Sequence, residues 1–150
     1  FKLSALLLTI QLLSLTSCDN RKCCDIIDTN VQILYKTSTG ENLINSSSDF
    51  SAENIKIYYK TGNEFKYIYE ANLDSPNMHF IDSTQNGDLI LTIFPSDDLQ
   101  DNFSTTLVQL NEQIADTLLC EFSVTENSLI CRKAWLNGVP MPNRFLEVVK

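Results

Sequence analysis

An acidic loop carries the side chains best suited to a metal ion. Residues 96–102 read Ser-Asp-Asp-Leu-Gln-Asp-Asn, which places the carboxylates of Asp97, Asp98 and Asp101 close together in the chain. Calcium prefers hard oxygen ligands on a flexible loop. The segment lacks the glycine and the final glutamate of an EF-hand, so the alternative is a solvated acidic turn. Calcium at these three residues is the only cofactor that the sequence suggests.

Aromatic residues could build a second kind of site, a sugar-binding platform. A flat ring packs on the apolar C–H groups of a sugar, while a phenol hydroxyl or an indole N–H bonds its rim. The candidates for such a platform are Tyr58, Tyr59, Tyr67, Tyr69 and Trp135. A hairpin predicted around Gly62 decides which of the four tyrosines reach solvent.

The register of that hairpin follows from its apolar pattern. Pairing across a three-residue loop sets Tyr59 opposite Phe65 and makes one face wholly apolar or aromatic. This register points Tyr59, Tyr67 and Tyr69 inward. Tyr58 lies on the other, wet face, and it is therefore the tyrosine that we expect to be available to a ligand.

The composition argues against several classes of protein. The chain has 150 residues, 43% of them hydrophobic, which suits one globular domain and not a disordered chain. A formal net charge of -8 argues against a nucleic-acid partner, which needs a basic face. His79 is the only histidine, so a catalytic triad or a metal site with histidine ligands could be built only around that one residue. We expect no enzyme activity, the remaining option being a small hydrolase that uses two carboxylates.

The first eighteen residues carry an export signal. Lys2 precedes an apolar run over 3–15, which is shorter than the about 20 residues that a membrane crossing needs, so it is interpreted as the core of a secretory signal peptide. Leu-Thr-Ser-Cys at 15–18 then resembles the lipobox of bacterial lipoproteins. That resemblance implies lipidation of Cys18, which becomes the new N-terminus. The alternative is an ordinary signal peptide cut near Ser17.

Three regions follow from this interpretation. Residues 1–17 form the lipoprotein signal peptide, 18–29 the lipidated cysteine and a tether, and 30–150 the folded domain. More than one acyl chain is needed for stable anchoring, and a lipidated Cys18 would hold the domain on the membrane.

Four cysteines remain after the anchor, an even number that suits disulfides in an exported chain: Cys23, Cys24, Cys120 and Cys131. A hairpin would bring Cys120 and Cys131 nearly opposite each other, and one residue of register decides whether their Cβ atoms meet. An adjacent-residue disulfide between Cys23 and Cys24 is strained. Pairing one of these two with Cys120 or Cys131 is the preferred alternative.

Short apolar-alternating runs fill the rest of the chain. They recur about every ten residues, and all four glycines fall between them, as in a β-meander. The run 88–94 is apolar on both faces, which predicts a central strand. The expected strands are 31–36, 54–60, 64–71, 78–83, 88–95, 103–110, 113–123, 128–136 and 143–149. The predicted fold is a single all-β, antiparallel sandwich of about 7–9 strands.

Looser motifs add a family resemblance. With the lipobox at Cys18, the stretches 23–25, 40–44 and 135–138 resemble small uncharacterised lipoproteins of the Bacteroidota. The resemblance implies an immunoglobulin-like or transthyretin-like sandwich on a lipid anchor, and it brings no catalytic residues. Two Asp-Ser/Thr motifs also resemble the O-glycosylation sites of exported proteins from these bacteria, with Ser83 and Thr117 as acceptors.

Together these features predict a cell-envelope protein without chemistry of its own. We expect it to be anchored in the outer membrane, with the periplasmic side favoured because Asp19 is followed by Asn, Arg and Lys and not by an acidic run. The expected function is binding or scaffolding of other envelope components. The alternative is a glycan-binding accessory lipoprotein of a polysaccharide-uptake system, which exposed aromatic side chains would favour.

Overall fold

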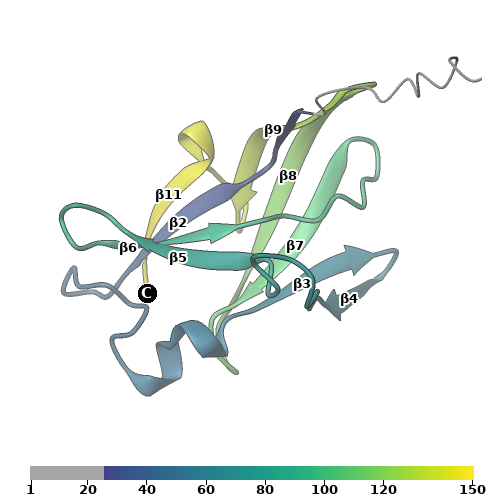
Figure 1. Cartoon of the computed structure of the whole chain (residues 1–150). Helices are drawn as coiled ribbons and strands as arrows, with labels where there is room; N and C mark the ends of the chain where they lie inside the picture. The colour runs from purple at the N-terminus through teal and green to yellow at the C-terminus, as the bar shows by residue number, and fades with distance from the viewer. Residues whose placement is uncertain (1–25) are drawn as a thin grey trace, which may run out of the picture.

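The computed structural model describes residues 26–150, which fold into two β-sheets (Figure 1). The larger sheet has seven strands in the order β1-β9-β8-β7-β3-β4, with β10 on β9, and the smaller has four in the order β11-β2-β6-β5. The strands are β1 (Ile26–Asp28), β2 (Val31–Lys36), β3 (Lys56–Thr61), β4 (Glu64–Tyr67), β5 (His79–Ser83), β6 (Leu89–Ile93), β7 (Phe103–Gln109), β8 (Ala115–Thr125), β9 (Ser128–Leu136), β10 (Val139–Pro140) and β11 (Phe145–Val149). Short 3-10 turns occur at Ser48–Phe50, Ala52–Asn54 and Pro142–Arg144.

The predicted all-β sandwich is confirmed, and all nine expected strands are present. Most strand ends agree within about two residues, but the strand expected over 64–71, which is β4, already ends at Tyr67. The strand over Leu89–Ile93 lies between β2 and β5, so its central position is confirmed. The structure adds two short strands, β1 and β10.

Two of the pairings are parallel, which the prediction of a purely antiparallel sandwich missed. β1 runs parallel to β9, and β11 runs parallel to β2. The chain passes from β1 in the larger sheet to β2 in the smaller one across only residues 29–30. Because no hairpin joins β1 to β9 or β2 to β11, neither pair has to be antiparallel.

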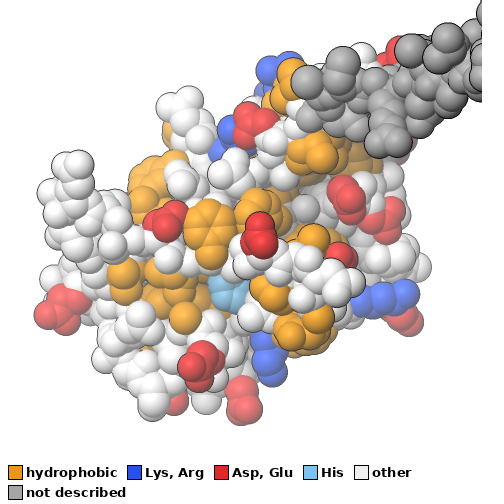
Figure 2. Space-filling view, in the orientation of Figure 1, with side chains coloured by type: hydrophobic (Ala, Val, Ile, Leu, Met, Phe, Trp, Pro, Cys, Tyr) orange, Lys and Arg blue, Asp and Glu red, His pale blue; other side chains and the backbone are white. Residues whose placement is uncertain are grey.

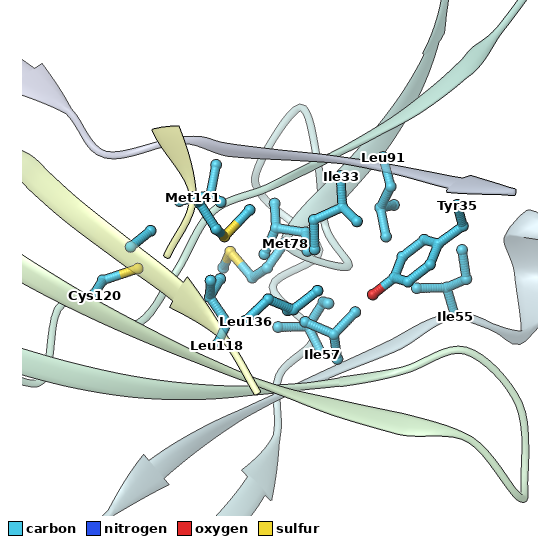
Figure 3. Close-up of a cluster of buried hydrophobic side chains, with 14 of the residues drawn as sticks. Ile33, Tyr35, Ile55, Ile57, Met78, Leu91, Leu118, Cys120, Leu136 and Met141 are labelled. Atoms are coloured by element: carbon cyan, nitrogen blue, oxygen red, sulfur yellow. The ribbon is translucent and has the colours of Figure 1, made fainter. Parts of the chain in front are cut away.

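The core lies between the two sheets (Figure 3). Ile33 and Tyr35 of β2 are fully buried against Ile57, Leu118 and Leu136 of the larger sheet. Buried and half-exposed residues alternate along β7 and β8, as they must when one sheet face is covered. Burial of each such side chain stabilises the fold by roughly 1.5–3 kcal/mol.

A buried carboxylate ties the last strand to the rest of the sandwich. Asp116 on β8 is 1% exposed and accepts hydrogen bonds from the Tyr35 hydroxyl at 2.8 Å, the Asn137 amide at 2.7 Å and the Lys150 ammonium at 2.6 Å. Burial and the neighbouring carboxylate together raise the pKa of Tyr35. Every polar group of the cluster thus has a partner, which is the condition for a buried charge to be tolerated.

The register of the β3–β4 hairpin differs from the prediction by one residue. The turn has two residues, Gly62 and Asn63, so that Lys60 faces Phe65 and Tyr58 faces Tyr67. Gly62 adopts a φ of 62°, which suits such a tight turn. Since side chains alternate along a strand, the shift of one residue moves Phe65 and Tyr67 to the opposite face of the sheet.

Candidate binding surface

The outward face of the seven-stranded sheet carries a group of aromatic and aliphatic side chains. Their neighbours in sequence, such as Ile57, Val108 and Leu118, point into the core. We call this outward set the aromatic face; it consists of Tyr58, Phe65, Tyr67, Phe103, Leu107, Leu119 and Trp135. None of these side chains is fully buried. Large exposed apolar patches generally mark interaction sites, so this face is the candidate binding surface.

One end of the aromatic face is a pair of tyrosines. Tyr58 and Tyr67 are cross-strand partners with ring centroids 5.6 Å apart and ring planes tilted by 58°. The Tyr58 hydroxyl donates to Gln109 Oε1 at 2.8 Å, which fixes the ring. Tyr67 remains 48% exposed. Tyr58 thus has the outward direction that the sequence predicts. The predicted inward positions of Tyr67 and Tyr69 are wrong, since Tyr69 is 60% exposed as well.

The other end is an aromatic pair formed by β7 and β9. The rings of Phe103 and Trp135 lie 6.5 Å apart at 37°. Leu119 of β8 is the cross-strand partner of Trp135 and is 36% exposed. The larger sheet therefore holds two aromatic pairs on one face, one on β3 and β4 and the other on β7 and β9.

A shallow depression of about 450 Å³ lies beside Trp135 and Leu119, and polar groups line the rest of it. These are Thr105, Thr117 and Asn137. Asn137 is held rigidly, because its side-chain oxygen accepts from the Thr117 N–H at 2.8 Å and its amide donates to Asp116. The depression thus combines an indole ring with a fixed amide and two threonine hydroxyls, groups that suit a polyhydroxylated ligand.

Basic side chains accompany the aromatic face although the whole chain is acidic. Lys60 follows Tyr58 on the same side of β3, and Lys133 on β9 pairs with Glu121 at 2.9 Å. On the face drawn in Figure 2, by contrast, acidic side chains are spread among the hydrophobic patches.

The three aspartates proposed to bind calcium do not converge. Asp97 borders one hollow, whereas Asp98 and Asp101 border another beside Lys60 and Phe103. Within residues 26–150 no group of three or more His, Cys, Asp or Glu side chains is arranged to hold a metal ion. Asp101 and Asn102 both adopt positive φ, so the chain turns at the third aspartate.

A second hollow, of about 600 Å³, lies at one end of the sandwich. Its apolar wall includes Leu73, Met78 and Phe94, and its rim carries Glu70, Asp74 and Asp97. Tyr59 also lines it, but its hydroxyl donates to the Phe94 carbonyl at 2.8 Å. Burial, helped by the nearby carboxylates, raises the pKa of Tyr59. Phe94 is paired with Phe80 at 5.8 Å between ring centroids, but three acids on the rim make this hollow a poorer site for a neutral ligand than the aromatic face.

The remaining predicted site residues divide into described and undescribed ones. Ser83 at the end of β5 and Thr117 on β8 are both exposed, and Thr117 also lines the depression beside Trp135. Cys120 and Cys131 are buried and not linked to each other. The lipidation site Cys18 and the disulfide candidates Cys23 and Cys24 lie outside the described residues.

The sequence contains a signal that could have found Phe65 and Tyr67. Gly62-Asn63 is compatible with a two-residue turn, and counting outward from it gives the observed pairs. A three-residue loop instead places Tyr59, Phe65 and Tyr67 together on one face, which is why the apolar pattern alone favours it.

Comparisons of the chain with protein-family models, curated proteins and solved structures find no match. The family resemblance and the anchor therefore stay predictions from motifs. Among the described residues, no helix is long and apolar enough to cross a membrane.

Proposed function

We propose that the chain is a non-catalytic glycan-binding module of the cell envelope, and that the aromatic face holds the glycan. The observation that carries this proposal is the placement of two aromatic pairs, Tyr58–Tyr67 and Phe103–Trp135, on one outward sheet face, with a mainly apolar depression beside Trp135 that also holds threonine and asparagine side chains. Rings supply stacking surfaces for sugar C–H groups, and the threonines and Asn137 supply hydrogen bonds to hydroxyls.

The span of the face supports a chain-like ligand over a single sugar. Tyr58 on β3 and Trp135 on β9 are three strand spacings apart, which corresponds to about 14 Å at the usual separation of neighbouring strands. A flat surface of this length fits an extended oligosaccharide. Lys60 at its edge would also accept an acidic group on such a chain.

Rigidity also supports the proposal. The aromatic side chains stand on paired strands, so that little backbone order has to be gained on binding. Tyr58 is further fixed by its bond to Gln109. A face prepared in this way loses less free energy to ordering than a set of loops would.

The predicted lipid anchor at Cys18 gives the module a place in the envelope. A lipid-anchored glycan binder serves as an accessory to polysaccharide uptake or as an attachment to envelope polysaccharides. Fractionation of cells that express the wild type and Cys18→Ala tests the anchor. Release of Cys18→Ala alone from the membrane is expected, and protease added to intact cells then reports which side the domain faces.

Binding is tested with the purified domain on a panel of neutral and acidic polysaccharides, by affinity electrophoresis followed by calorimetry. We expect saturable binding to at least one of them and a loss of about tenfold or more in affinity for Trp135→Ala and for Tyr67→Ala. Phe80→Ala is the matched control, because Phe80 is an exposed aromatic residue on the other sheet.

The competing outcome is a protein occupant of the same face, as the scaffolding function would require. No binding to any polysaccharide, together with a co-purifying envelope protein that Trp135→Ala releases, would replace the glycan by a protein. Equal losses for Phe80→Ala and Trp135→Ala would instead show that the aromatic face is not the site.

A further inference from the structure

A β-bulge brings two cysteines together inside the sandwich. Strands β8 and β9 pair regularly from Leu118 to Glu121, with Cys120 opposite Ala134. The register then shifts by one residue, and Phe122 faces Cys131. Without that shift Cys131 would face Ser123 and point outward. The extra residue is Arg132, which is exposed, so the bulge turns Cys131 into the core.

Both thiols are therefore buried on the same inner face. Cys120 is 0% and Cys131 3% exposed, and the Cys120 thiol lies within hydrogen-bond range of the Cys131 sulfur. Figure 3 shows the Cys120 sulfur directed into the core cluster, at the end away from Tyr35. The hydrogen bond between the two thiols, together with burial, raises the pKa of Cys120, which donates it. The same hydrogen bond lowers the pKa of Cys131, which accepts it.

We infer that Cys120 and Cys131 form a disulfide in the exported protein, locking the bulge between β8 and β9. A buried free cysteine can serve simply as a small apolar side chain. Here, however, two thiols lie at diagonal inward positions of neighbouring strands, with a hydrogen bond between their side chains. The observed register also bears on the other pairing, because β1 begins with Ile26 opposite Ser128 and runs parallel to β9. That alignment places Asp28 opposite Ile130, so the residue after Asp28 is the next in register with Cys131.

The oxidation balances with an exchange partner. One thiolate of the pair attacks the disulfide of an envelope thiol–disulfide oxidoreductase, forming a mixed disulfide and releasing one thiolate of that enzyme. The second thiolate of the pair then attacks the sulfur of the first and displaces the enzyme. Two protons and two electrons leave Cys120 and Cys131, and the oxidoreductase is reduced to its dithiol. The supply of this oxidant rests on the export proposed above.

Peptide mass spectrometry of the exported, full-length protein after thiol alkylation tests the bridge. Between Lys66 and Arg132 the chain has no Lys or Arg, so trypsin leaves both cysteines in one peptide. Cleavage after Glu121 and Glu126 separates them unless they are bridged. We expect a cross-linked pair of fragments without alkylated sulfur, which reduction splits. The same result is expected in the double variant Cys23→Ser/Cys24→Ser.

Reduction should also lower the unfolding midpoint of the wild type by roughly 5–10 °C. Cys120→Ala already lacks the bridge and should show no further shift on reduction. Alkylated Cys120 and Cys131, or Cys131 linked to Cys23 or Cys24, would overturn the inference. If the thiols are free, oxidised glutathione added to purified protein identifies the error. Formation of the disulfide in vitro would show that the proposed export is wrong. Failure to form it would show that the two sulfurs are not placed for a bridge.

Discussion

The two faces of the seven-stranded sheet are built from the same strands but are used differently. On β3, Ile57 is fully buried, while its neighbour Tyr58 points to solvent beside Tyr67. On β8, Leu118 and Leu119 divide in the same way. The inner face contains mostly aliphatic side chains, with Phe122, two thiols and one fully bonded carboxylate among them, whereas the outer face carries aromatic rings that no part of the described chain covers. Residues adjacent in sequence therefore have separable roles: the inner ones stabilise the fold, and the outer ones form the surface that we propose as the binding site.

The largest loss in the free energy of unfolding is expected for Asp116→Ala, a change on the inner face. The change leaves the buried Tyr35 hydroxyl, the Asn137 amide and the Lys150 ammonium without their common acceptor. We expect a loss of about 3–5 kcal/mol in the free energy of unfolding, measured by denaturant titration. Asp116→Asn retains one acceptor and should lose less. If Asp116→Ala were as stable as the wild type, the inner face would not be the stabilising one.

A matched pair on one strand separates the two faces most sharply. Ile57→Ala should lower the free energy of unfolding by about 2–5 kcal/mol, because it opens a cavity in the core. Tyr58→Ala should cost only about 1 kcal/mol, from the lost contacts with Tyr67 and Gln109. Urea unfolding of both variants measures the difference. Equal losses would break the distinction between the faces.

Trp135→Ala tests the outer face, through glycan binding as well as stability. It should reduce glycan affinity by about tenfold, equivalent to about 1.4 kcal/mol, and change stability by less than Ile57→Ala does. Calorimetric titration and thermal unfolding of the same sample give both numbers. A variant that unfolds readily but binds normally would show that Trp135 belongs functionally to the core.

The smallest effect concerns the edge of the sheet, where Arg144 bonds both carboxylate oxygens of Asp28 at 2.7 and 3.0 Å. The Arg144 hydrogen bond, assisted by its charge, lowers the pKa of Asp28 below its ordinary value of 3.8. The stabilisation is therefore present above about pH 4 and is lost as pH falls through the lowered pKa. Since the pair is partly exposed, Arg144→Gln should cost less than about 1 kcal/mol at pH 7 and less again in strong acid, where only the bond from Arg144 to the Asp28 carbonyl remains. Unfolding curves at pH 7 and pH 2.5 check this; a constant difference would contradict the ion pair.

The inner face could be predicted from the sequence because alternation along the strands is a strong signal. The inward positions of Ile57 and Tyr59 and the central strand over Leu89–Ile93 follow directly from it. The outer face depends on weaker information. A turn of two residues instead of three moves Tyr67 outward, and the bulge at Arg132 moves Cys131 inward. Such single-residue shifts leave the fold unchanged but reassign the site, and hydrophobic periodicity does not encode them.

The parallel strands β1 and β11 show a further limit. Both lie near the ends of the described chain and pair with strands far away in sequence. Ile26 and Ile27 are exposed, so their apolar character gave no register for burial. Only the three-dimensional arrangement of the two sheets determines where such edge strands pair.

The most direct test of the central claim uses the fact that the chain contains a single tryptophan, Trp135, which stands on the aromatic face. Intrinsic tryptophan fluorescence is followed while a polysaccharide that binds in affinity electrophoresis is added. We predict a saturable change in intensity or wavelength whose midpoint equals the calorimetric dissociation constant. Binding that calorimetry detects but that leaves the Trp135 emission unchanged would contradict the assignment of the aromatic face as the binding surface.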